Sequence, residues 1–90
     1  MTMSTESDIA KENIFNKEIF ISSNIEYLRK KNRMTQEKLG ETLGYTYTTI
    51  GNWEKGIRTP DAVDLVRLSR IFNVTTDKLL TENIKLNESK

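Results

Sequence analysis

The sequence contains no cysteine and no histidine. Their absence excludes disulfides, thiol redox chemistry, the usual zinc sites and imidazole acid–base catalysis. Carboxylates and lysines remain as titratable groups, but no carboxylate pair and no nucleophile with a neighbouring base forms a catalytic pattern. We therefore expect a protein that is not an enzyme and that holds no metal or cofactor.

Long apolar runs are also missing, since none approaches the ~18–20 residues that a transmembrane helix needs. The N-terminus carries Glu6 and Asp8 where a secretory leader would have a basic segment followed by an apolar one. We expect a cytoplasmic protein without membrane association. Ninety residues, 36% of them hydrophobic and 30% charged, suit one small domain near the lower limit for a self-sufficient core.

Positive charge is scarce overall, with a formal net charge of +1, but it is unevenly distributed. Residues 1–20 have a net charge of −2, residues 21–60 hold seven basic against four acidic side chains, and residues 61–90 hold five of each. The excess in residues 21–60 favours attraction to phosphates. An ordinary solvated surface would give a similar pattern, so charge alone does not decide between the two.

Residues 35–54 contain two short helical patterns separated by a tight turn. Gly44 lies where the chain must reverse, and glycine enters the left-handed region without steric cost. Thr46 follows at the N-cap position of the second helix, where its hydroxyl can accept a backbone N–H. Gly40 is a small residue on the inward side of the first helix. This layout predicts a helix-turn-helix, for which DNA is the leading ligand.

Three further helices are expected around the motif. The predicted helices cover residues 22–31, 36–43, 47–54, 60–72 and 76–82. Ser23 with Glu26 suggests a capping box for the first, and Thr59 before Pro60 suggests an N-cap for the fourth. We place its inner stripe at Ala62, Leu65, Leu68, Ser69 and Phe72. Residues 21–82 thus form one domain, and residues 83–90 a frayed polar tail in which Ile84 and Leu86 could still pack.

Residues 1–20 form an N-terminal arm whose structure the pattern leaves open. Its beginning is too polar to order itself, but apolar side chains then appear at Ile9, Ile14, Phe15, Ile19 and Phe20. A short irregular helix that packs on the domain or on a partner and a mobile arm are equally compatible with this pattern.

Several short motifs resemble the phage-repressor and Cro-type helix-turn-helix family, also called the xenobiotic-response-element family. The matching segments are Met34–Leu39, Leu43–Gly44, Ile50, Trp53–Gly56 and Arg58–Pro60. The likeness covers roughly residues 21–82. It implies an all-α, compact five-helix lambda-repressor-like domain.

The resemblance also implies roles for individual residues. The family's base-reading positions fall on Tyr47, Thr48 and Asn52, which share the outer face of the second motif helix if Ile50 and Trp53 face inward. The phosphate-contacting candidates are Arg29, Thr35, Gln36, Thr46 and Arg58. Arg29 and Glu54 form an ion pair in the family. Trp53 is expected to be a core anchor, whereas Tyr45, where the family usually has a smaller residue, suits either a phosphate contact or packing over the turn.

The expected function is that of a sequence-specific double-stranded DNA-binding transcriptional regulator. The simplest version is a repressor that binds a palindromic operator as a homodimer. Its dimer surface would involve Leu80 and the tail from Ile84 to Leu86. The alternative is an antitoxin or antirepressor-like interaction module of the same fold, with a protein partner bound through the N-terminal arm.

Overall fold

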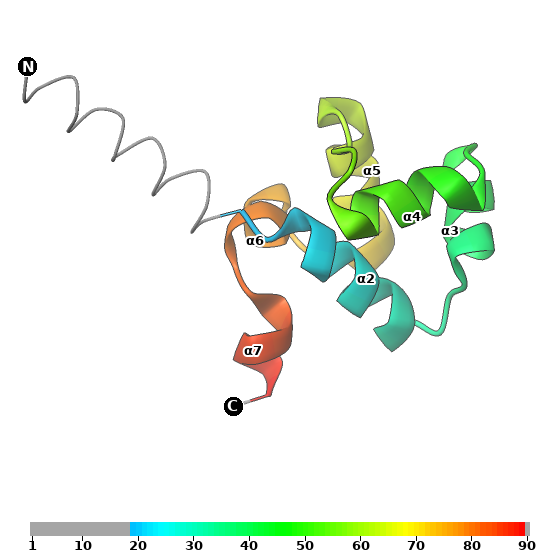
Figure 1. Ribbon diagram of the computed structural model, residues 1–90. Coiled ribbons are helices and arrows are strands. Elements are labelled where there is room, and N and C mark those ends of the chain that lie inside the picture. Colours follow the sequence, from blue (N-terminus) through cyan, green and yellow to red (C-terminus); the bar gives the residue numbers. More distant parts are fainter. Residues whose placement is uncertain (1–18, 90) are drawn as a thin grey trace, which may run out of the picture.

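The computed structural model describes residues 19–89, in which every regular element is a helix (Figure 1). The six helices of this part are α2 (Ile21–Lys31), α3 (Gln36–Leu43), α4 (Tyr47–Lys55), α5 (Ala62–Phe72), α6 (Thr76–Thr81) and α7 (Ile84–Glu88). The all-α class is confirmed, with one helix more than the five expected. Within residues 19–89, no helix is long and apolar enough to cross a membrane. The predictions for the arm before Ile19, including a partner bound there, lie outside the described residues.

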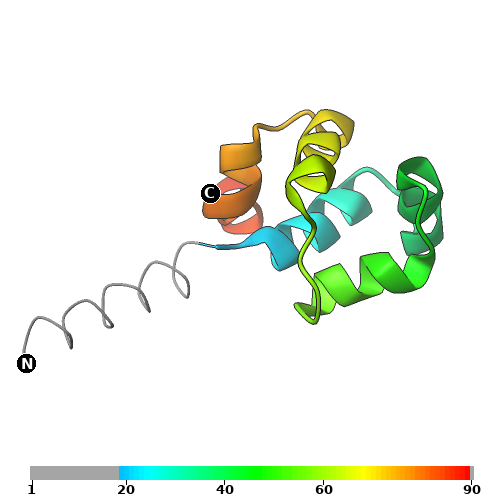
Figure 2. The same ribbon diagram turned by 90° about the horizontal axis from the view of Figure 1, so that it is seen from above.

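Helix α2 runs through the middle of the described part, with α3 and α4 towards one end and α6 and α7 at the other (Figures 1 and 2). It packs against α4, α6 and α7, while α3 packs against α4. The core takes apolar side chains from all six helices, among them Ile25, Leu28, Leu39, Leu43, Ile50, Trp53, Leu68, Phe72, Leu79 and Ile84. The helix-turn-helix therefore packs against α2 through α4.

The turn between α3 and α4 depends on two glycines, as predicted. Gly44 lies in the left-handed region, with φ 83°. A Cβ at Gly40 would come within 2.7 Å of the backbone oxygen of Tyr45, so only glycine fits this close approach. Thr46 occupies the N-cap position of α4, but its hydroxyl makes no capping bond. Instead the N–H of Thr49 donates to the backbone oxygen of Thr46 at 3.1 Å.

Helix α2 begins within one residue of the prediction, but the capping box of Ser23 and Glu26 is wrong. Ile21 is the first helical residue and Phe20 is the N-cap. The Ser23 hydroxyl donates to the backbone oxygen of Phe20, and Glu26 pairs with the lysine four residues later. The start is set by a tertiary contact, since the N–H of Phe20 donates to the backbone oxygen of Leu80 at 2.7 Å.

Helix α5 begins later than predicted, because its cap is Asp61 and not Thr59. The Asp61 carboxylate accepts the N–H of Asp64 at 2.8 Å, which satisfies a backbone donor of the first turn. Pro60 is buried ahead of the helix. The inner stripe is also corrected, since Ala62 is exposed and Asp64 is buried among the predicted Leu68, Ser69 and Phe72.

The expected polar tail contains a helix, α7, whose first residue belongs to the core. Ile84 is fully buried. The buried Asn24 of α2 holds this end of the chain: its amide nitrogen donates to the backbone oxygens of Leu79 and Glu82 at 2.7 Å. Its side-chain oxygen accepts the N–H of Ile84 at 3.2 Å. Ile84 therefore packs within its own domain, which removes it from the expected dimer surface.

Candidate nucleic-acid interface

Helix α4 divides into a buried and an exposed side. Ile50 is fully buried and Trp53 is 4% exposed, so the prediction of Trp53 as a core anchor is confirmed. Tyr47 is 60% exposed, Thr48 is exposed and Asn52 is half-buried. We call Tyr47, Thr48 and Asn52 the reading face. Two buried anchors on the opposite side hold this face outward.

The reading face borders a shallow hollow of about 140 Å³. The hollow is lined by Gln36, Tyr47, Thr48, Gly51, Asn52 and Lys55. A Cβ on Gly51 would lie 3.7 Å from the side-chain amide of Gln36, which is an ordinary contact distance. The structure therefore brings the three predicted base-reading residues together, and α4 itself has room for a small side chain at Gly51.

Arg29 and Glu54 join α2 to the end of α4. The Arg29 Nε lies 2.6 Å from Glu54 Oε2, Nη2 donates to Oε1 at 3.1 Å, and the two side chains are 10% and 5% exposed. Arg29 Nη1 also donates to the backbone oxygen of Met34 at 2.8 Å. The hydrogen bond to Glu54 raises the pKa of Arg29 above its ordinary value, against the opposing effect of burial. The guanidinium is thus charged and fixed in direction.

Gln36 shares the Glu54 carboxylate, a contact that no pattern in the sequence indicates. Its Nε2 donates to Glu54 Oε1 at 3.0 Å. An ionised carboxylate only accepts, so the amide must turn its nitrogen towards Glu54, and this bond uses one of its two N–H donors. One carboxylate therefore ties together α2, α3 and α4.

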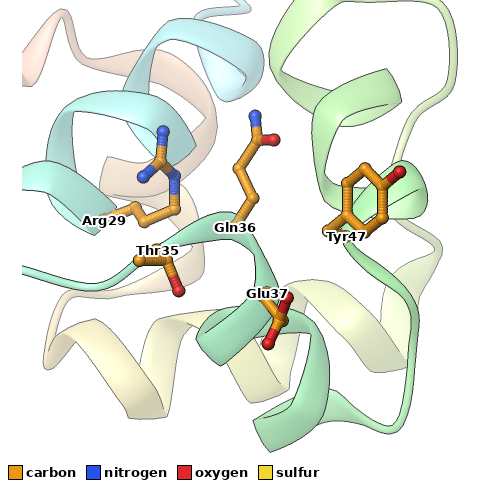
Figure 3. Close-up of a pocket in the computed structure, with 5 residues that line it drawn as sticks. All are labelled: Arg29, Thr35, Gln36, Glu37 and Tyr47. Atoms are coloured by element: carbon orange, nitrogen blue, oxygen red, sulfur yellow. The ribbon is translucent and has the colours of Figure 1, made fainter.

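A larger open hollow, of about 460 Å³, lies beside the helix-turn-helix (Figure 3). It is lined by Arg29, Thr35, Gln36, Glu37 and Tyr47. Figure 3 shows the Gln36 amide extending to the same side as the Arg29 guanidinium, while the Glu37 carboxylate points the other way. The Thr35 hydroxyl accepts the N–H of Lys38 at 2.9 Å, so Thr35 caps α3. Three of the predicted phosphate-contacting residues thus share one side of α4.

The other two predicted phosphate-contacting residues lie elsewhere. Arg58 is exposed in the loop after α4 and lines a separate hollow of about 290 Å³ that Asn52 also borders. Thr46 is exposed at the start of α4. Asn52 therefore borders two hollows, one shared with Gln36 and one shared with Arg58.

Tyr45 packs over the turn, which is one of its two predicted alternatives. Its hydroxyl donates to both carboxylate oxygens of Asp64, at 2.9 and 3.0 Å. Its ring meets Trp53 edge to face, with ring centroids 5.7 Å apart. The hydrogen bond to Asp64 raises the pKa of Tyr45. Nothing local in the sequence pairs residues 45 and 64, and only the unusual size of Tyr45 hinted at a contact.

A helix-turn-helix family model matches residues 25–79 of the chain. Among curated relatives, the transcriptional activator BcrR of Enterococcus faecalis is 39% identical over 57 residues, which are 63% of this chain and 28% of that protein. The transcriptional regulator ImmR of Bacillus subtilis is 38% identical over 52 residues, which are 58% of this chain and 41% of that protein. The match thus spans less than half of either relative.

The fold is also similar to that of the P22 c2 repressor, whose crystal structure was solved in complex with a synthetic operator. The TM-score is 0.64 at 30% sequence identity, and the match covers 68% of this chain and 92% of the repressor chain. The residues that the family model matches contain α3, α4 and the turn between them. This chain belongs to the phage-repressor and Cro-type family of helix-turn-helix DNA-binding proteins.

Proposed function

We propose that this domain binds double-stranded DNA in a sequence-specific manner and regulates transcription. The observation that carries the proposal is the reading face, which gathers Tyr47, Thr48 and Asn52 on the outer side of a helix anchored by Ile50 and Trp53. A helix of this kind fits the major groove, where side-chain donors, acceptors and methyl groups distinguish base pairs. The likeness to a repressor solved with its operator supports the same conclusion.

Each residue of the reading face has a chemical match among the bases. The amide of Asn52 pairs in a bidentate manner with adenine, and Thr48 offers a hydroxyl or a methyl group to thymine. Tyr47, which is 60% exposed, hydrogen-bonds a base or packs on a thymine methyl. Gly51 presents no side chain, so this helix reads with fewer groups and approaches the bases more closely.

The phosphate contacts fall on the two sides of the reading face. Arg29, held by Glu54, provides a fixed positive charge, and Gln36 provides the second N–H of its amide. Thr35 and Thr46 stand at the starts of α3 and α4, where helix N-termini favour anions. Arg58 contacts the backbone from the opposite side.

The proposed regulator is a repressor that occludes a palindromic operator as a homodimer. Three reading side chains cover only a few base pairs, which cannot single out one site among the ~10⁶ or more in a genome. Two copies on symmetric half-sites double the contacts. The relatives include an activator. Expression of a reporter gene placed downstream of the operator therefore tests whether this protein represses or activates transcription.

Selection of bound sequences from randomised DNA tests this proposal. We expect the recovered sites to contain two symmetric half-sites, each with an adenine at the position read by Asn52. Recovery of sequences without any enrichment over the starting pool would overturn the proposal of sequence-specific binding.

A further inference from the structure

Helix α5 holds the turn between α3 and α4 on both sides of Gly44. Before the glycine, the backbone oxygen of Leu43 accepts a hydrogen bond from Arg67 Nη2 at 2.7 Å. After the glycine, the hydroxyl of Tyr45 donates to the carboxylate of Asp64. Arg67 Nη1 also lies 3.6 Å from Asp64 Oδ1. Two residues on one helix thus contact both residues next to the pivot of the helix-turn-helix.

Asp64 favours one position of the turn, because its side chain is only 6% exposed. A buried carboxylate is costly unless hydrogen bonds and a positive charge compensate for the lost water. Tyr45 supplies a hydroxyl to both of its oxygens and Arg67 supplies the nearby charge. Any movement of Tyr45 away from α5 leaves Asp64 without this donor, so the turn has one strongly preferred position.

The ring of Tyr45 connects this contact to the reading face. It packs against Trp53 of α4, and it lines the same hollow as Asn52 and Arg58. Rotation of α4 about Gly44 would therefore change the contacts of the Tyr45 ring as well as the position of Asn52. Binding constellations work only when their groups are held within ~0.5 Å of the productive geometry.

We propose that Tyr45, Asp64 and Arg67 form a clamp that sets the angle of α4 and thereby the sequence specificity of the domain. Tyr45 is then a positioning residue and not a phosphate contact. The proposal rests on the DNA-binding function proposed above. Contacts to base edges depend on the angle of α4. Long side chains can keep a contact with a phosphate when the helix rotates slightly. The clamp therefore affects specificity more than general affinity for DNA.

The variant Y45F tests the clamp, because it removes the hydroxyl and keeps the ring on Trp53. We expect the ratio of affinities for the operator and for a scrambled duplex to fall about tenfold at a temperature where the variant is fully folded. Affinity for the scrambled duplex and its salt dependence should stay within twofold of the parent. The matched control is Y27F, which removes a hydroxyl bond of 2.6 Å to Glu88 at the α2–α7 contact.

Three results would overturn the proposal. Equal affinity loss for all DNA would make Tyr45 a phosphate contact. An unchanged ratio with only a lower melting temperature, as expected for Y27F, would make its role purely structural. Unshifted amide resonances of α4 in DNA-free Y45F would show that the clamp does not position the helix. This last measurement needs no DNA, so it stays decisive if the parent binds no operator and the proposed function fails.

Discussion

At the scale of single residues, Glu54 does more than pair with Arg29. Its carboxylate accepts hydrogen bonds from the Arg29 guanidinium and from the Gln36 amide, which come from two different helices. These donors are the side chains that we propose to face phosphates. One buried acceptor at the end of α4 therefore orients the phosphate contacts relative to the reading face.

Two alanine substitutions should separate base reading from phosphate contact. Asn52→Ala removes the amide that we propose to read a base, and we expect a loss of ~1–3 kcal/mol at one preferred base pair with relaxed preference there. Gln36→Ala removes a proposed phosphate contact and should weaken binding to all DNA sequences nearly equally. Binding followed by sequencing of the bound DNA measures both. Unchanged site preference in Asn52→Ala, or a loss confined to one base pair in Gln36→Ala, would reverse the assigned roles.

Trp53→Ala should lower the free energy of unfolding by ~3–5 kcal/mol, because it leaves a cavity in the core. That is a large share of the ~5–15 kcal/mol that stabilises a domain. Denaturant unfolding measures the change. Ile57→Ala, at a position 65% exposed, is the control and should stay within ~0.5 kcal/mol of the parent. If Trp53→Ala melted within a few degrees of the parent, the inward assignment of Trp53 would be wrong.

At the scale of elements, the last turn of α7 is held to α2 by the Glu88 carboxylate, while Asn24 and the buried Ile84 hold its first turn. Glu88 accepts hydrogen bonds from the Tyr27 hydroxyl at 2.6 Å and from Lys31 Nζ at 2.7 Å. The bonds from Lys31 and Tyr27 lower the pKa of Glu88 below its ordinary value. A lowered folded-state pKa means that this contact stabilises α7 above the ordinary glutamate pKa of ~4.3 and is lost as the pH falls through the lower value.

We therefore expect α7 to loosen in acid while the rest of the domain stays folded. Chemical shifts of residues 84–88 followed between neutral pH and about pH 2 would show the change below the ordinary glutamate range. The variant E88Q should be loosened already at neutral pH and should lack the acid transition. Shifts of α7 that remain constant in the parent down to the lowest pH would contradict the role of this contact.

At the scale of the whole molecule, two domains should cooperate on symmetric half-sites about one helical turn, ~10 base pairs, apart. Inserting ~5 base pairs between the half-sites rotates one domain to the opposite face of the DNA, and we expect cooperative binding to disappear. Footprinting of both operators measures this effect. A single protected asymmetric site that is indifferent to the insertion would contradict dimeric binding.

The dimer surface can be tested without unfolding the domain. Removal of residues 79–90 is unsuitable, because Leu79 and Ile84 are fully buried. Leu86 remains at that end with 55% of its surface exposed. We expect Leu86→Ser to reduce cooperativity between half-sites while binding to one half-site stays intact. Val63→Ser, at a position 66% exposed on α5, is the matched control. Loss of cooperativity in Val63→Ser alone would show that the dimer interface lies on α5 and not at Leu86.

Most of the structure of residues 35–56 could be predicted from the sequence of that segment alone. The prediction of both motif helices, of left-handed Gly44, and of inward Ile50 and Trp53 is confirmed. Each of these features depends on signals within a few residues, because helical periodicity, glycine and capping act locally. The Arg29–Glu54 pair came from family resemblance, and the structure contains it. The roles of the proposed DNA contacts remain predictions.

Only the tertiary structure decided the features that depend on distant partners. The Phe20–Leu80 hydrogen bond, and not a local capping box, begins α2, and Asn24 brings Ile84 into the core from 60 residues away. Asp64 is buried in α5 because Tyr45 and Arg67 satisfy it. From the sequence alone, a polar side chain is predicted to be exposed to solvent. Its burial becomes favourable only when the folded chain supplies its hydrogen-bonding partners.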